Sequence, residues 1–343
     1  MGYKFLKVFF ALLCLILLGF FAFYGLLFKD NIIDNEINKN HEFFISTGAN
    51  YQDVLKSLQE NQILLNKKSF DILSKRLKYD QLIKPGRFLI PNNMNNWDLI
   101  HKLRSGDQDA VRVTINNITY IDDLIGKVAK KLEFDSIELA NTIYSDSFLN
   151  THNLNKDNLI SYFISNTYEI WWNTSVTSFL SKMDKEHKKF WNIVRLEQAR
   201  KLNLSPEQVT TLASIVQKES NKKDEHKRIA GVYINRLNDN WPLQADPTVK
   251  FALRQLDLKR ILTVHTQFDS PFNTYRNIGL PPGPICLPEI FAIDGVLNTE
   301  KHSYFFFCAK EDFSGYHNFA TTLAEHNSNA TKYQQALNQR GIK

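Results

Sequence analysis

The residue best suited to acid–base chemistry is Glu219, which ends an apolar stripe within the segment TLASIVQKESN (211–221). The stripe recurs at helical spacing and consists of Val209, Leu212, Ala213 and Val216. Burial without a cationic partner raises the pKa of a carboxyl group, and the negative end of a helix acts in the same direction. A carboxyl group kept protonated near neutral pH can protonate a glycosidic oxygen. Glu219 is therefore a candidate general acid.

The helix that must position Glu219 has a clear start. Ser205 is a good N-cap, and Pro206 suits the first helical position. Gln208 completes a capping box three residues after the serine. This start predicts a helix over 206–219, with a second one carrying an apolar face over 229–237. A structural alternative for the carboxylate stays open, in which it pairs with one of three nearby lysines: Lys218, Lys222 and Lys223.

Two proline-containing segments carry further candidate groups. Residues 241–251 (WPLQADPTVKF) are predicted to be neither regular helix nor central strand, and such a loop can display Gln244, Asp246 and Thr248. In the second segment, 273–285 (NTYRNIGLPPGPI), Tyr275 could stack on a sugar and Asn273 could bond to its hydroxyls or amide. Ordinary surface turns are the alternative for both segments.

The sequence lacks the motifs typical of metal-dependent catalysis, acyl transfer and nucleotide binding. His317, Glu325 and His326 could ligate a metal, but without an H-E-x-x-H pair we expect no metal site. The sequence contains no G-x-S-x-G, P-loop or G-x-G-x-x-G motif, which argues against acyl transfer and nucleotide binding. The three cysteines form no C-x-x-C motif, and spacing leaves open whether Cys286 and Cys308 pair.

The composition describes a globular protein with a mild basic bias. A length of 343 residues predicts about two domains, and 43% hydrophobic with 23% charged residues excludes a disordered chain. The net charge of +6 suits an anionic polymer or a membrane surface. No run of lysine and arginine is dense enough to indicate nucleic-acid binding.

The N-terminus predicts a single membrane span. Residues 8–28 carry no charge and, at ~1.5 Å per residue, extend about 31 Å, close to the hydrocarbon thickness of a bilayer. No A-x-A-like cleavage site follows, so we expect a signal anchor. Lys4 and Lys7 precede the span, and acidic residues join the lysines after it. The positive-inside rule then places the N-terminus in the cytoplasm and residues 30–343 outside the cytoplasmic membrane.

The remaining chain predicts an α+β protein. Residues 1–29 form the cytoplasmic tip and anchor, and 30–41 a polar linker. A small α/β module over 42–115 alternates three short strands (43–45, 88–90, 111–115) with three amphipathic helices near 51–58, 70–77 and 97–103. A larger mixed domain follows over 116–343, with its core at 205–330 and a strand at 304–308.

Seven sequence blocks in a fixed order resemble the endolytic murein transglycosylase family, also called YceG-like. The blocks are ASIVQKE (213–219), INRL (234–237), LQADPTV (243–249), NTY (273–275), GLPPGPI (279–285), YFF (304–306) and TTLAEHN (321–327). The anchor also fits, and the 42–115 module resembles the family's LysM-like subdomain by pattern. The resemblance thus covers nearly the whole chain.

The resemblance implies an endolytic lyase of cell wall biogenesis that cuts nascent peptidoglycan strands after N-acetylmuramic acid. The family uses one carboxyl group and no cofactor. That group protonates the leaving oxygen, then takes the proton of the sugar's own C6 hydroxyl, which leaves a 1,6-anhydro end. The catalytic glutamate of the family corresponds to Glu219, and a second glutamate common in the family is replaced here by Gln217.

The resemblance also implies a set of substrate-binding residues. They are Gln244, Asp246, Thr248, Asn273, Thr274, Tyr275, Pro282, Gly283 and His317. It implies partners among the cell-wall synthesis enzymes and a location in the inner membrane with the catalytic domain on the periplasmic side. Two departures, Ile115-Asn116-Asn117 for I-P-E-G and Phe163–Tyr168 for F-P-[DN]-T-Y, lie outside the catalytic block.

Two alternatives remain at this point. The first is a conventional hydrolase with Glu219 as acid and Asp246 as base or nucleophile, for which the separation of the two carboxyl groups matters. The second is a non-catalytic peptidoglycan-binding scaffold, against which the intact Glu219 and the intact NTY and GLPPGPI blocks argue.

Overall fold

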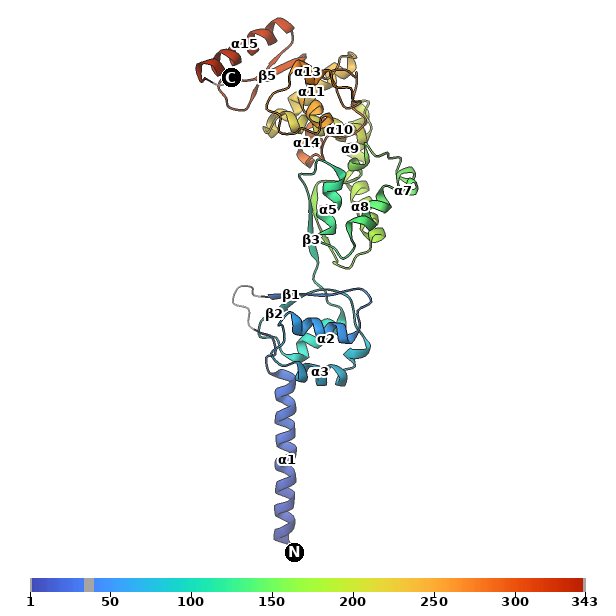
Figure 1. Ribbon diagram of the computed structural model, residues 1–343, viewed down its shortest axis with the longest axis vertical. Coiled ribbons are helices and arrows are strands. Elements are labelled where there is room, and N and C mark those ends of the chain that lie inside the picture. The colour runs from blue at the N-terminus through green and yellow to red at the C-terminus, as the bar shows by residue number, and fades with distance from the viewer. Residues whose placement is uncertain (1, 34–39, 342–343) are drawn as a thin grey trace. The chain divides into compact units, whose positions relative to one another are not determined.

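The computed structural model describes residues 2–33 and 40–341 (Figure 1). The chain divides into two compact units, each with its own core. The first unit consists of residues 1–112, 131–134 and 169–175. The second unit consists of residues 113–130, 135–168 and 176–343. Part of the predicted linker, residues 34–39, lies outside the described residues.

A long apolar helix, α1 (Gly2–Phe28), leads into the first unit. Its stretch Phe5–Phe28 has a mean hydropathy of 2.6 and is long and apolar enough to cross a membrane, judged by length and composition. Its C-terminal end is tied to the unit that follows. Leu27 packs in the core there, and Nδ2 of Asn96 donates to the carbonyl of Leu26 at 3.0 Å. The predicted N-terminal apolar helix is confirmed.

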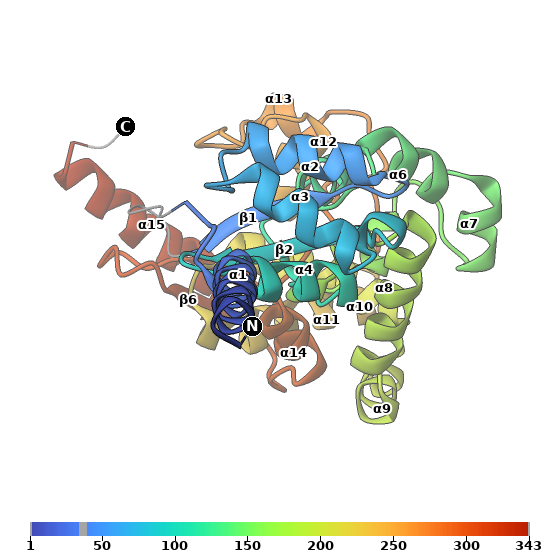
Figure 2. The ribbon, with the colours of Figure 1, turned by 90° about the horizontal axis from the view of Figure 1, so that it is seen from below.

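The rest of the first unit packs helices against a two-stranded sheet. Strand β1 (Asn40–Ile45) pairs antiparallel with β2 (Gly86–Pro91), and Figure 2 shows the two side by side. Phe43 lies opposite Phe88, and both side chains are buried. The helices are α2 (Tyr51–Glu60), α3 (Lys67–Arg76), η1 (Tyr79–Gln81) and α4 (Asn96–Ser105). The predicted apolar faces of α2, α3 and α4 form the core of this unit.

A second two-stranded sheet pairs segments far apart in the sequence. It consists of β3 (Val111–Ile115) and β4 (Asn166–Ile170). The hydroxyls of Thr114 and Thr167 lie 2.9 Å apart across the two strands. The alternation predicted for 111–115 holds, because Val113 and Ile115 are buried and Thr114 is exposed.

Helices build most of the second unit. Before the central helix come α5 (Ile121–Ala129), α6 (Ser136–Ile143), α7 (Asp146–Thr151), η2 (Leu159–Tyr162), α8 (Val176–Phe190) and α9 (Ile193–Lys201). The central helix is α10 (Pro206–Glu219), and α11 (His226–Asn238), α12 (Asp246–Ala252) and α14 (Ile290–Leu297) pack against it (Figure 1). The remaining elements are η3 (Lys223–Glu225), α13 (Thr263–Thr266), β5 (Phe306–Ala309), β6 (His317–Ala320) and α15 (Leu323–Gln339).

The central helix is buried along most of its length. Its apolar residues lie wholly within the core: Val209, Leu212, Ala213, Ile215 and Val216. Such burial contributes roughly 1.5–3 kcal/mol for each large aliphatic side chain, so the position of this helix is firmly fixed. The observed bounds match the predicted helix, and the mixed α+β architecture is confirmed.

One local prediction was wrong, and another was right in kind with shifted bounds. The segment 241–251 is irregular only over residues 241–245, because α12 begins at Asp246 with Pro247 in its first turn, where proline's missing N–H costs nothing. The expected strand 304–308 is displaced, since β5 begins at Phe306. Its pairing with β6, in which Phe306 lies opposite Ala320, sets these bounds.

Candidate active site

Helix α10 ends at Glu219, and both ends of the helix are held. At the start, the Gln208 N–H donates to Oγ of Ser205 at 3.2 Å, and the Ser205 N–H donates to Oε1 of Gln208 at 2.8 Å. At the other end, Ser220 leaves the helix for an extended conformation with φ −140° and ψ 136°. The carboxyl group of Glu219 therefore emerges where the buried face of the helix runs out.

Glu219 faces a cleft of about 410 Å³ in the second unit. The polar lining is contributed by Glu219, Tyr233, Arg236, Gln244, Asp246, Tyr275, His317 and His326. The apolar lining comes from β5 and the start of α15: Phe306, Phe307, Cys308, Ala309 and Leu323. A mixture of converging polar groups and apolar walls is typical of a ligand site.

The surroundings of Glu219 favour its protonated form. Burial, aided by the negative charge of Asp246, raises the pKa of Glu219 to about 7. The hydroxyl of Tyr233 donates to Oε1 of Glu219 at 2.6 Å, and this bond acts against the rise. The positive charges of Arg236 and Lys250 also lower the pKa, by less than the hydrogen bond does. The balance is a carboxyl group that can give and take a proton near neutral pH.

The neighbouring lysines do not neutralise Glu219. Nζ of Lys222 lies 4.6 Å from the ring centre of Tyr316, and Nζ of Lys223 lies 4.1 Å from that of Phe291. Among the residues that the structure describes, no ion pair includes Glu219. The structural alternative, a lysine-paired glutamate, is therefore not what the fold contains.

Asp246 and Tyr275 form a second polar pair in the cleft. The hydroxyl of Tyr275 donates to Oδ1 of Asp246 at 2.6 Å. Burial raises the pKa of Tyr275, and the hydrogen bond to Asp246 adds to the effect. Asp246 also occupies the first turn of α12, where the helix dipole stabilises a negative charge.

Three of the predicted binding residues lie behind this pair rather than in the cleft. Thr248 and Thr274 are buried, with hydroxyl oxygens 2.8 Å apart, and the Ala245 N–H donates to Oγ1 of Thr274 at 3.0 Å. Nδ2 of Asn273 donates to the carbonyls of Thr266 and Phe268. Its Oδ1 accepts from the Tyr275 N–H at 3.0 Å. These polar groups are used within the protein, where they fix the backbone that carries Asp246 and Tyr275.

Comparison with known proteins assigns the family. The family model described as "YceG-like family" matches residues 43–332, which is most of the chain. The chain belongs to the YceG-like family. The expected resemblance is thereby confirmed, and the cleft of about 410 Å³ beside Glu219 lies wholly within the matched region.

Two named proteins and one crystal structure are similar to this chain. The endolytic murein transglycosylase of Bacillus subtilis (strain 168) is 27% identical over 314 residues, which cover 86% of this chain and 85% of the relative. That of Streptococcus pneumoniae serotype 2 is 26% identical over 92% of this chain and 62% of its own length. A crystal structure of the putative yceG-like protein lmo1499 from Listeria monocytogenes is 26% identical, with a TM-score of 0.56. The match covers 84% of this chain and 98% of that one.

Three of the polar residues that line the cleft were not among the predicted catalytic and binding residues: Tyr233, Arg236 and His326. Arg236 is buried and donates to the carbonyls of Phe305 at 2.8 Å and Leu243 at 2.6 Å. It therefore holds the strand-side and loop-side walls of the cleft together. The sequence offered a signal for it, because INRL was one of the seven blocks, and Tyr233 directly precedes that block.

The predicted binding residues Gln244, Pro282 and Gly283 lie in three different settings. Gln244 lines the cleft, is exposed and has a left-handed φ of 50°. Pro282 is exposed and lines a different cavity. Gly283 packs so closely on the chain that an added Cβ would lie 2.0 Å from the carbonyl oxygen of Asp157. The structure thus does not bring Pro282 or Gly283 into the cleft with Glu219.

The three residues considered as metal ligands, His317, Glu325 and His326, have different roles in the structure. His317 and His326 line the cleft, whereas Glu325 caps α15 by accepting from the Thr322 N–H at 3.3 Å. Nδ1 of His317 lies 2.9 Å from Oε2 of Glu225. Within the described residues, no group of three or more His, Cys, Asp or Glu side chains is arranged to hold a metal ion. Cys286 and Cys308 are both free thiols.

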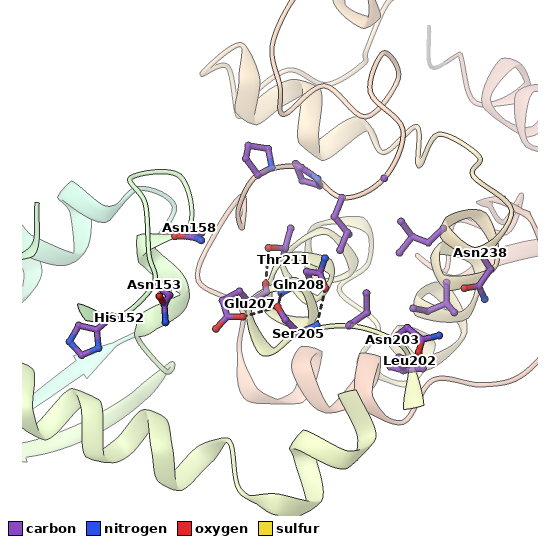
Figure 3. Close-up of a pocket in the computed structure, with 17 residues that line it drawn as sticks. His152, Asn153, Asn158, Leu202, Asn203, Ser205, Glu207, Gln208, Thr211 and Asn238 are labelled. Carbon is purple, nitrogen blue, oxygen red and sulfur yellow. Dashed lines mark hydrogen bonds between the residues drawn. The ribbon is translucent and has the colours of Figure 1, made fainter. Parts of the chain in front are cut away.

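A larger cavity, of about 880 Å³, lies at the opposite end of α10 (Figure 3). Its wall includes the capping residues Ser205 and Gln208, with His152 and Asn153 from the region that follows α7. Oε2 of Glu207 accepts from Oγ of Ser205 at 2.7 Å. Glu219, whose carboxyl pKa is raised, does not line this cavity. The larger volume alone therefore does not make it the candidate active site.

Proposed function

We propose that the chain is an endolytic lytic transglycosylase of peptidoglycan. The observation that carries the proposal is Glu219, whose carboxyl pKa is raised to about 7 at the wall of a cleft. The family membership and the names of the two relatives support the same activity. The enzyme class is thus that of a carbon–oxygen lyase acting on a polysaccharide.

In the proposed reaction, Glu219 acts twice. Its carboxyl proton passes to the glycosidic oxygen as the bond from that oxygen to C1 of N-acetylmuramic acid breaks. The resulting carboxylate then takes the proton of the C6 hydroxyl while the C6 oxygen bonds to C1. The product is a 1,6-anhydro end, Glu219 regains its proton, and no water is consumed. A pKa near 7 suits both steps, because neither protonation state is strongly favoured.

Neighbouring residues stabilise the negative charge that appears on Glu219 between the two steps. The Tyr233 hydroxyl already donates to Oε1 of Glu219 at 2.6 Å, and it requires no reorganisation during the reaction. The charge of Arg236 acts in the same direction and comes from a guanidinium held by two carbonyls. These groups favour the carboxylate while burial favours the acid.

We propose a division of labour among the other candidate residues. Those that line the cleft contact the glycan: Gln244, Asp246, Tyr275 and His317. Thr248, Asn273 and Thr274 act indirectly, by holding the backbone under Asp246 and Tyr275. Pro282 and Gly283 fix the loop on the Asp157 backbone, away from the cleft.

The remaining parts of the proposal concern location and substrate choice. The apolar helix α1 would anchor the protein in the inner membrane by a single pass, with the N-terminus in the cytoplasm and the cleft on the periplasmic side. The order β1-α2-α3-β2, with antiparallel strands, supports a LysM-like subdomain within 42–115, followed by a catalytic domain over 116–343. An anchored enzyme would act on nascent strands and terminate them, beside cell-wall synthesis enzymes.

A two-carboxylate hydrolase is the second candidate, because Asp246 lines the same cleft as Glu219. Asp246 would then serve as base or nucleophile and water would enter the product. The hydrogen bond from Tyr275 to Asp246 already uses one of its oxygens, which favours the first candidate.

The products distinguish the two candidates. Full-length protein in detergent micelles is incubated with purified peptidoglycan, beside the Glu219→Gln variant, and the products are identified by mass spectrometry. We expect internal cuts that end in 1,6-anhydro sugar and that are lost in the variant. Reducing ends, heavier by one water, would contradict the lyase and make Asp246→Asn the next variant to test.

A further inference from the structure

A second carboxylate, Glu225, is buried immediately beside the catalytic helix. Its side chain is 5% exposed, although a carboxylate rarely enters a protein core without partners that offset the lost hydration. Glu225 ends η3 and directly precedes α11, so the backbone brings it back under the end of α10. None of the sequence patterns pointed to it.

Three hydrogen bonds converge on this carboxylate. Oε1 accepts from the backbone N–H of His317 at 2.9 Å, and Oε2 lies 2.9 Å from Nδ1 of the same residue. Oε2 also accepts from Oγ of Ser220 at 3.2 Å. Both oxygens of Glu225 are thus occupied, and two of the three bonds go to one histidine on β6.

The hydrogen bond to Glu225 determines which ring nitrogen of His317 carries the proton. A carboxylate accepts hydrogen bonds and cannot donate them, so the bond at 2.9 Å requires the proton on Nδ1. Nδ1 is thereby used, and Nε2 is the ring nitrogen left for the cleft that His317 lines. In the neutral ring this nitrogen carries a lone pair and accepts a hydrogen bond. The Phe307 ring, edge to face with the imidazole at 5.4 Å, holds it from the side.

The same network reaches the catalytic glutamate. Ser220 directly follows Glu219, and its Oγ is bonded to Glu225 while its carbonyl oxygen lies 2.8 Å from Nε2 of His226. Glu225 is therefore bonded both to Ser220, the residue directly after the catalytic helix, and to the histidine that lines the cleft. The buried side chain of Glu225 thus links the end of the helix that carries Glu219 to the imidazole of His317.

We propose that Glu225 is a positioning residue for the transglycosylase reaction. It fixes His317 with the proton on Nδ1, so that Nε2 accepts a hydrogen bond from an N–H or O–H of the N-acetylated sugar in the cleft. In this role His317 orients the sugar relative to Glu219. The inference rests on the proposed function for the identity of the sugar, whereas the state of the imidazole can be measured without any activity.

Replacement by glutamine gives the sharpest test. In Glu225→Gln the side chain keeps its shape, but its NH2 group can donate to Nδ1 and thereby move the imidazole proton to Nε2. Nε2–H then faces the cleft as a donor, which is the wrong polarity for a sugar N–H or O–H. The matched control is Asp224→Asn, which removes the adjacent exposed carboxylate, bonded to the Tyr316 hydroxyl at 3.2 Å outside the cleft.

The first measurement is the ring-nitrogen NMR spectrum of the full-length protein in detergent micelles, labelled in histidine and assigned with His317→Gln. We expect the Nδ1–H form at His317 in the wild type and in Asp224→Asn, and the Nε2–H form in Glu225→Gln. An Nε2–H form in the wild type would overturn the proposal, whether or not the protein cleaves peptidoglycan.

The second measurement separates a positioning role from a purely structural one. We expect Glu225→Gln to lower kcat/KM for 1,6-anhydro product formation by about 10- to 100-fold, the scale of one charge-assisted hydrogen bond. In a His317→Ala background the same substitution should change kcat/KM by less than about threefold, because its target is gone. An equal loss in both backgrounds would show that Glu225 acts on the fold alone. Wild-type cleavage that leaves reducing ends would instead contradict the proposed function.

Discussion

The two ends of α10 place the same residue type in opposite settings. Glu207 lies in the first turn, beside the larger cavity, where the positive end of the helix dipole favours a negative charge. Glu219 lies in the last turn, beside the smaller cleft, where burial and the dipole both oppose the charge. Glu207 also receives a hydrogen bond from Ser205, within the cap.

The comparison separates the size of a cavity from its chemistry. The cavity of about 880 Å³ is bordered by a completed cap whose polar groups bond to one another. The cleft of about 410 Å³ is lined by Glu219, whose carboxyl pKa is raised to about 7, and by a second carboxylate, Asp246. The proposed acid is thus distinguished by the unfavourable placement of one carboxyl group, Glu219, at the end of a buried helix.

The largest expected effect comes from replacing Glu219, with the same replacement of Glu207 as the matched control. Glu219→Gln should lower the rate of 1,6-anhydro product formation by on the order of 10³- to 10⁴-fold, because one group supplies both proton transfers. Glu207→Gln should leave the rate within about twofold. Both rates are measured on the same peptidoglycan with full-length protein. A comparable loss in Glu207→Gln would assign a catalytic part to the larger cavity.

Helix α10 shows how much of the candidate site could be predicted from the sequence. Ser205, Pro206 and Gln208 specify its start by local chemistry, and the apolar stripe specifies which face is buried. Both signals act within a few residues along the chain. The position of Glu219 at the end of the buried face therefore followed without any tertiary information.

Long-range pairs could not be predicted in the same way. Tyr233 reaches Glu219 from the next helix, and Glu225 reaches His317 across 92 residues of sequence. Asn273 was predicted to bond to a sugar, with a surface turn as the alternative, yet it is fully buried and its amide donates to two carbonyls. Such roles depend on which segments meet in space, and no local spacing encodes them.

A pH profile of kcat/KM tests which groups set the pKa of Glu219 at the C-terminal end of α10. In the wild type, kcat/KM should fall above about pH 7 as Glu219 loses its proton. Tyr233→Phe removes a hydrogen bond that lowers the pKa of Glu219, so this alkaline limb should move to higher pH. Asp246→Asn removes a charge that raises the pKa, so the limb should move down. Shifts of the same sign in both variants would contradict the assignment.

The smallest expected effect is at the N-terminal end of the helix. Ser205→Ala removes the acceptor of the Gln208 N–H and half of the capping box. The loss should cost about 1 kcal/mol of stability, seen as a fall of about 2–4 °C in the thermal midpoint of the full-length protein. Ser205→Asp, which keeps an acceptor at the cap, is the matched control and should fall by less.

The same variant also tests whether the two ends of α10 are independent. Because the middle of the helix is buried and Oγ of Ser214 is bonded to the Ile285 N–H, fraying of the first turn should not reach Glu219. The rate of product formation by Ser205→Ala should therefore stay within about twofold, with an unchanged alkaline limb. A shifted limb would mean that the cap at one end helps to set the pKa of Glu219 at the other, and that the helix dipole contributes more to the acid than its burial does.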